Sequence, residues 1–94
     1  MVSKSFKNYK FERNSKIVFT ELDDEVCLFN PEKGEYLNLN QTGSRIWNLL
    51  DKPTLIERII EVLFEEYDGT NENIYLNTEL FIKDGLQKEI FKVS

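Results

Sequence analysis

The side chains that most often carry out chemistry in proteins are scarce in this sequence. It contains no histidine, so the commonest general base and metal ligand is missing. Cys27 is the only cysteine, and a thiol needs a neighbouring base to act as a nucleophile. Because Cys27 lies between apolar residues in a predicted strand, we expect it to be a small buried apolar side chain. This content predicts neither thiol catalysis nor an internal disulfide.

The acidic side chains form no convergent site either. Asp23-Asp24 and Glu65-Glu66 are adjacent pairs, and adjacent residues in a turn or on a helix point in different directions. The segment 23–25 is too short for a calcium loop. No Cys/His spacing suits zinc, and Gly34 and Gly43 form no phosphate-binding pattern. We therefore expect a protein with no catalytic residues, no metal site and no cofactor.

Length and charge narrow the class of protein further. The 94 residues predict one domain, and the formal net charge is −5. This charge disfavours nucleic acids and anionic membranes as partners, because both need clustered lysine and arginine. No apolar run approaches the roughly 18 residues of a membrane span, and the N-terminus lacks the apolar core of a signal peptide. We expect a soluble, cytoplasmic protein, which also fits the single cysteine.

The first half of the chain predicts a three-stranded antiparallel meander. Apolar and β-branched residues predict strands over 16–20, 25–29 and 35–39. The turns between them fall at Asp23-Asp24 and at 30–34, where turn-forming residues gather. Such short connections favour antiparallel neighbours.

The second half predicts helices. Asn40 is placed to cap the first, which ends near Asp51. Thr54 and Glu57 have the spacing of a capping box, with Thr54 as the N-cap of the second helix, and Gly69 closes it. Its apolar residues form one stripe: Leu55, Ile56, Ile59, Ile60, Leu63 and Tyr67.

A third helix is predicted to begin within 71–73 and to end at Asp84-Gly85, followed by a turn or strand over 86–93. The polar residues 1–14 are typical of a partly ordered arm, and an added first strand is the alternative. Strands followed by helices indicate an α+β fold.

Two features suggest binding rather than catalysis. The strand over 35–39 is an outer strand of the meander, with Leu37 and Leu39 on one face and Tyr36 and Asn38 on the other. Its unpaired backbone groups either accept a peptide as an added strand or are protected within the protein.

The third helix is apolar in more directions than one core contact requires. Its apolar residues fall into three groups: Ile74 with Phe81, Leu76 with Leu80, and Tyr75 with Ile82 and Leu86. A groove for a partner, burial on two sides and a dimer interface each explain this pattern.

The segment 34–50 resembles the hallmark of the PqqD-like family. In that family an aromatic-bearing strand runs into Leu-Asn, then Gly, then Ile-Trp, and Leu39-Asn40, Gly43 and Ile46-Trp47 occupy those places. The similarity extends over about 16–86. This sequence departs from the family in the third helix, where Asn77 replaces an apolar residue and an extra residue precedes the closing glycine.

The resemblance implies a winged helix-turn-helix-like fold, a three-stranded antiparallel sheet followed by a three-helix bundle. It also implies a non-catalytic chaperone that binds the leader of a ribosomally made precursor peptide. The leader would add as a strand and be presented to a modifying enzyme, such as a radical SAM protein or a lasso-peptide protease. The expected peptide-binding residues are Glu35, Tyr36, Leu37, Asn38, Leu39, Leu76, Leu80 and Lys83. The expected structural residues are Asn40, Gly43, Ile46 and Trp47.

Two other readings of the sequence remain. A winged-helix DNA-binding regulator would share the helical topology, but Lys83 is set against Glu79 and Asp84 in the third helix. That helix therefore offers no basic recognition face. A structural dimerisation module is the second alternative, and the expected oligomeric state is a monomer or weak homodimer.

Overall fold

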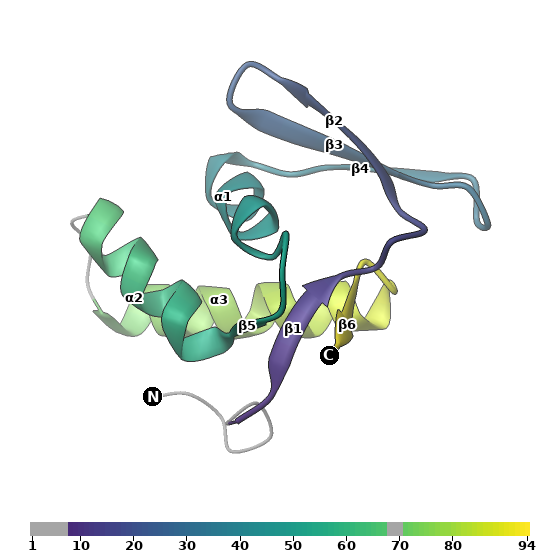
Figure 1. Cartoon of the computed structure of the whole chain (residues 1–94). Helices are drawn as coiled ribbons and strands as arrows, with labels where there is room; N and C mark the ends of the chain where they lie inside the picture. The colour runs from purple at the N-terminus through teal and green to yellow at the C-terminus, as the bar shows by residue number, and fades with distance from the viewer. Residues whose placement is uncertain (1–7, 68–70) are drawn as a thin grey trace.

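Two small antiparallel sheets and three helices make up the computed structural model, which describes residues 8–67 and 71–94 (Figure 1). The predicted α+β class is confirmed. The elements in chain order are β1 (Lys10–Arg13), β2 (Val18–Leu22), β3 (Glu25–Asn30), β4 (Glu35–Asn38), α1 (Gln41–Leu49), β5 (Thr54–Leu55), α2 (Ile56–Glu66), α3 (Asn71–Gln87) and β6 (Phe91–Val93). In Figure 1 the sheet of β2, β3 and β4 forms a layer above α1, and the other helices lie below.

The predicted meander is confirmed as the sheet β2-β3-β4. Its two turns lie where turn-forming residues were expected, and Asp23 and Gly34 adopt positive φ values of 59° and 67°. Gly34 suits this left-handed conformation because it has no Cβ. One face of the sheet turns toward the core and buries Val26 and Leu28, at 2% exposure each. The predicted alternation along β4 is also confirmed, since Tyr36 is exposed and Leu37 is half-buried.

The second sheet, ordered β5-β1-β6, was not predicted. Of the expected arm over 1–14, residues 10–13 form β1, and residues 1–7 lie outside the described part of the chain. Phe11 pairs with Thr54 on one side and Val93 on the other, and its side chain is 1% exposed. Burial of this aromatic ring fixes the segment as a strand rather than a loose arm.

The predicted first helix is confirmed with its cap. Asn40 Oδ1 accepts a hydrogen bond from the Gly43 N–H at 2.8 Å. The helix ends at Leu49, two residues before the predicted boundary. Its buried side places Ile46 and Trp47 in the core, at 1% and 0% exposure.

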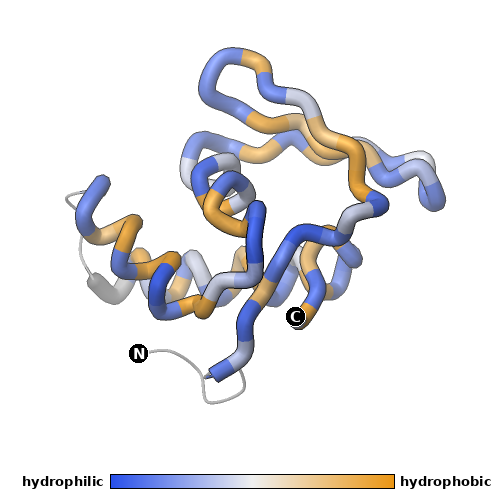
Figure 2. Tube along the Cα trace, viewed as in Figure 1, coloured by the Kyte–Doolittle hydropathy of each residue, from blue (hydrophilic) through white to orange (hydrophobic). Residues whose placement is uncertain are grey.

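The predicted capping box of the second helix is wrong. Leu55 is the N-cap residue and makes no side-chain cap. Thr54 is drawn into β5 by pairing with β1, and its hydroxyl donates to the carbonyls of Leu49 at 3.2 Å and Lys52 at 2.8 Å. Of the predicted stripe, Ile56, Ile59, Ile60 and Leu63 are buried, whereas Leu55 is 39% exposed and Tyr67, just after α2, is half-buried. Figure 2 shows hydrophobic and hydrophilic residues alternating along α2. The expected closing residue Gly69 lies outside the described residues.

The third helix runs past its predicted end, because Gly85 lies inside α3 and does not terminate it. A Cβ at this position would overlap the ring of Phe91. Gly85 therefore serves close packing between α3 and β6. The chain reverses at Glu89, whose φ is 61°, and then forms β6. A strand was one of the two alternatives expected over 86–93.

Candidate functional site

The strand β4 forms one edge of its sheet. It pairs with β3 along its length, and no described strand pairs with its other side. An unpaired edge presents backbone donors and acceptors that another extended segment can use.

The register shows which backbone groups face this free edge. The Leu39 N–H donates to Val26 O at 2.8 Å, in the register that pairs Asn38 with Cys27 and Leu37 with Leu28. Hydrogen-bonded pairs alternate along an antiparallel ladder, so Leu37 and Leu39 direct their N–H and C=O groups toward β3. Tyr36 and Asn38 consequently direct theirs toward the free edge.

A hollow of about 510 Å³, here called the first hollow, lies beside β4. Its lining joins the inner face of the sheet to the turn between α3 and β6. The apolar residues of this lining are Ile17, Leu28, Leu37 and Ile90. The polar and rim residues are Asn30, Lys33, Glu35, Tyr36 and Lys88. An apolar floor with a polar rim at a free strand edge suits an extended peptide, because the backbone can pair while alternate side chains are buried.

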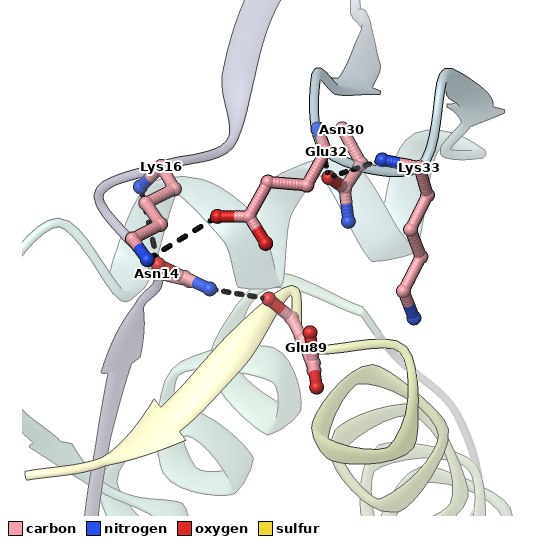
Figure 3. A network of polar contacts seen from close by, with 6 residues as sticks. All are labelled: Asn14, Lys16, Asn30, Glu32, Lys33 and Glu89. Atoms are coloured by element: carbon pink, nitrogen blue, oxygen red, sulfur yellow. Dashed lines mark hydrogen bonds and ion pairs between the residues drawn. The ribbon is translucent and has the colours of Figure 1, made fainter.

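The two turns that border the first hollow are tied to one segment, the link between β1 and β2 (Figure 3). Asn14 Nδ2 donates to Glu89 O at 2.8 Å, and Lys16 Nζ forms an ion pair with Glu32 at 3.2 Å. The Glu32 N–H in turn donates to Asn30 Oδ1 at 3.0 Å. These contacts link both sides of the hollow to one segment, and the Lys16–Glu32 pair is an exposed one that contributes little stability.

The rim of the first hollow carries charges of both signs. Lys88 forms an ion pair with Asp84 at 3.0 Å. Within the described residues no ion pair is found for Lys33 or Glu35, and the Lys33 side chain extends toward the end of α3 (Figure 3). Because positive and negative side chains both line the rim, the hollow is better suited to a peptide backbone and apolar side chains than to a ligand with one strong charge.

A second hollow, of about 350 Å³, lies between the start of α1 and α3. It is lined by Asn40, Thr42, Gly43, Ile46, Asn77, Thr78 and Phe81. A Cβ built at Gly43 would lie 3.1 Å from the Phe81 ring, so the glycine permits this close approach. The chain leads from the first hollow along β4 to the second.

The three expected helix residues of the peptide site are all exposed on α3. Leu76 and Leu80 are 58% and 52% exposed, and Lys83 is also exposed. None of the three lines either hollow. They lie on the opposite side of the helix from Thr78 and Ile82, which are 1% and 0% exposed. By contrast, Glu35, Tyr36 and Leu37 line the first hollow as a group.

Arg13 is an organising residue that sequence reasoning missed. Its guanidinium lies 4.9 Å from the ring centroid of Phe19 and 4.7 Å from that of Trp47. Its Nε donates to Trp47 O at 2.8 Å. Burial is the main cause that lowers the pKa of Arg13. No local pattern around Arg13 signals this role, because the role depends on Trp47, which lies 34 residues further along the chain.

Groups for catalysis or metal binding are scarce in the described part of the chain. There, no cluster of three or more His, Cys, Asp or Glu side chains could hold a metal ion. Cys27 is half-buried rather than buried, because it lies on the outer face of the sheet. Among the described residues, no helix has the length and apolar character needed to cross a membrane.

The sequence profile of the family described as coenzyme PQQ synthesis protein D (PqqD) matches residues 25–90, well over half of the chain. The chain belongs to the PqqD family. The matched range spans β3, β4 and all three helices, and it includes every residue that lines the two hollows except Ile17. No curated protein matches this PqqD-family chain.

Two solved structures resemble this PqqD-family chain. The first is TbiB1 in complex with the TbiA(beta) leader peptide, with 28% sequence identity, a TM-score of 0.80, and coverage of 86% of this chain and 94% of TbiB1. The second is a lasso peptide synthetase B1 complexed with its leader peptide, with 19% identity, a TM-score of 0.73, and coverage of 87% of this chain and 96% of that protein. The second likeness shows the fold alone.

Proposed function

We propose that this chain is a recognition element that binds the leader of a ribosomally made precursor peptide. The leader adds as a strand along the free edge of β4. The observation that carries the proposal is this edge, with the backbone groups of Tyr36 and Asn38 directed outward beside the first hollow. Membership of the PqqD family and the likeness to TbiB1 with its bound leader peptide support it.

In this arrangement the leader side chains alternate between two environments. Those on the same face as Glu35 and Leu37 enter the first hollow, where Ile17, Leu28 and Ile90 offer apolar contact. Backbone pairing tolerates many leader sequences, and the hollow selects among their side chains.

The protein then presents the bound leader to an enzyme that acts on the rest of the precursor. A radical SAM protein or a peptidase is the expected type of enzyme, and no catalytic step is assigned to this chain. The supporting observation is the scarcity of catalytic side chains in the sequence, which has no histidine and a single cysteine.

The direct test is fluorescence anisotropy with the labelled leader of a precursor encoded beside this gene. Saturable binding is expected. Backbone N-methylation, introduced one leader residue at a time, should weaken binding at alternate positions, because only every second N–H of an added strand faces β4. Saturable binding with no such alternation would exclude strand addition, and absence of binding to every neighbouring leader would exclude the function itself.

The contribution of α3 stays a prediction that needs its own variant. If the leader contacts the side of α3 that carries Leu76, Leu80 and Lys83, Leu80→Asp should weaken binding about tenfold, since it places a charge in an apolar contact. Leu55→Asp is a matched control, because Leu55 is exposed and lines neither hollow. Parental affinity of a folded Leu80→Asp variant would confine the site to β4 and the two hollows.

A further inference from the structure

An apolar row crosses the outer face of the β2-β3-β4 sheet. Val18 lies directly opposite Phe29, and Phe29 lies directly opposite Tyr36. The rings of Phe29 and Tyr36 are 4.6 Å apart between centroids. Val18 is 55% and Tyr36 73% exposed, so the row is covered poorly at both ends. A solvated sheet face is usually polar, which makes a row of this kind a sign of contact with something else.

The row ends at the free edge of β4. Tyr36 is one of the two β4 residues that direct their N–H and C=O groups outward, away from β3. A strand added at this edge brings one of its residues directly opposite Tyr36. The side chain of that residue lies on the same outer face as the Tyr36 ring, because directly opposed residues share a face.

The residues around the row favour contact with an apolar side chain of an added strand. The adjacent row on the same face consists of Thr20, Cys27 and Asn38, none of them charged. The chain is 31% charged overall, but neither of these two rows contributes a charged side chain. A second copy of the chain is a poorer occupant, because each copy carries a formal net charge of −5.

We infer that the leader residue opposite Tyr36 carries a large apolar side chain, which lies on the Tyr36 ring as the fourth member of the row Val18–Phe29–Tyr36. This inference rests on the proposed function and adds a second selective position to it. The first hollow reads leader side chains on the inner face of the sheet. Tyr36 lies at the rim of this hollow, and its ring reads a leader side chain on the outer face, by stacking rather than by enclosure.

The test compares Tyr36→Ala with Tyr36→Phe by leader anisotropy. Tyr36→Ala should weaken binding about threefold to tenfold, the range of a cross-strand aromatic contact. Tyr36→Phe should bind like the parent, because the ring is retained. Leu22→Ala is the matched control: Leu22 is 68% exposed on the same sheet face, but it lies on β2, away from the free edge. Circular dichroism checks that each variant folds.

An alanine scan of the leader against both the parent and Tyr36→Ala identifies the partner side chain. One leader residue should be coupled to Tyr36: its replacement by alanine weakens binding to the parent but not to Tyr36→Ala. Parental affinity of a folded Tyr36→Ala, or strictly additive effects along the whole leader, would overturn the inference and leave the proposed function standing. A change in sedimentation of the peptide-free chain on Tyr36→Ala, without a change in leader affinity, would assign the row to self-association and likewise overturn it. A parent that binds no leader would overturn both.

Discussion

The hydroxyl of Ser44 accepts a hydrogen bond from the backbone N–H of Val26 at 2.8 Å, although the two residues belong to different elements. Ser44 Oγ also donates to Leu39 O at 3.3 Å. In the register of β3 and β4, Val26 and Leu39 stand opposite each other, so the serine takes the place of one ladder hydrogen bond. It thereby fixes the point at which the edge strand ends and α1 begins.

Replacement of Ser44 by alanine should destabilise the fold by about 1–3 kcal/mol, because it leaves the Val26 N–H buried without an acceptor. The measurement is the free energy of unfolding from urea denaturation. Thr42→Ala is a suitable control on the same helix, since Thr42 is exposed. Equal stability of the two variants would show that the hydrogen bond contributes little.

Trp47 should act through stability and not through contact with the leader. Its side chain is 0% exposed and packs against the rings of Phe19 and Phe91, at centroid distances of 5.4 and 6.0 Å. Trp47→Ala should cost about 3–5 kcal/mol by leaving a cavity. Trp47→Phe should cost less, because the indole Nε1 has no hydrogen-bond partner among the described residues. A Trp47→Ala variant that keeps parental stability but loses leader affinity would contradict this assignment.

Proline substitutions along β4 should separate folding from binding. The N–H of Asn38 faces the free edge, so Asn38→Pro should keep the fold and weaken leader binding about tenfold. The N–H of Leu37 faces β3, so Leu37→Pro should instead lower the free energy of unfolding by several kcal/mol. Circular dichroism and leader anisotropy on both variants give the comparison. Loss of folding in Asn38→Pro, with Leu37→Pro intact, would mean that the register is inverted.

The ion pair between Arg45 and Glu66 predicts a dependence of stability on pH. Arg45 Nε and Nη2 donate to the two carboxylate oxygens of Glu66 at 2.8 and 2.7 Å. The hydrogen bond to Arg45 lowers the pKa of Glu66 below its ordinary value of 4.5. Because the pKa of Glu66 is lowered in the folded state, the ionised carboxylate stabilises the fold at pH values above 4.5. This contribution is lost as the pH falls through the lowered pKa.

Glu66→Gln should therefore be less stable than the parent at pH 7, by at most about 1 kcal/mol, because the pair is largely exposed and screened by solvent. The difference should shrink as the pH falls below about 4.5, where the Glu66 carboxylate is protonated first in the unfolded state and then, at lower pH, in the folded state. Denaturation of both proteins at several pH values measures it. A difference that stays constant across this range would exclude the ion pair as its cause.

The parts of the fold that depend on neighbouring residues could be predicted from the sequence. The turns at Asp23 and Gly34 and the cap at Asn40 are local signals, and each lies where expected. These local signals determine where the edge strand lies and that Leu37 faces the first hollow.

The parts that depend on distant pairing could not be predicted. The strands β5 and β6 contain only two and three residues, and they exist because β1 lies between them. The same pairing displaced Thr54 from its expected capping role, since tertiary contacts override local preference. The contact between Arg13 and Trp47 joins segments 34 residues apart, which likewise explains why the role of Arg13 was not predicted.

The two sheets differ in how far apart along the chain their strands lie. The strands β2, β3 and β4 follow one another through short turns, whereas β1 joins β6 and pairs Phe11 with Val93. Closing so long a loop costs more conformational entropy, and contacts of large sequence separation form late in folding. During synthesis the edge strand can therefore take shape before residues 91–93 leave the ribosome, and the pairing of β1 with β6 follows. Hydrogen exchange should show the same order, with β3 amides more protected than those of β6, and equal protection in the two strands would argue for a single cooperative closure.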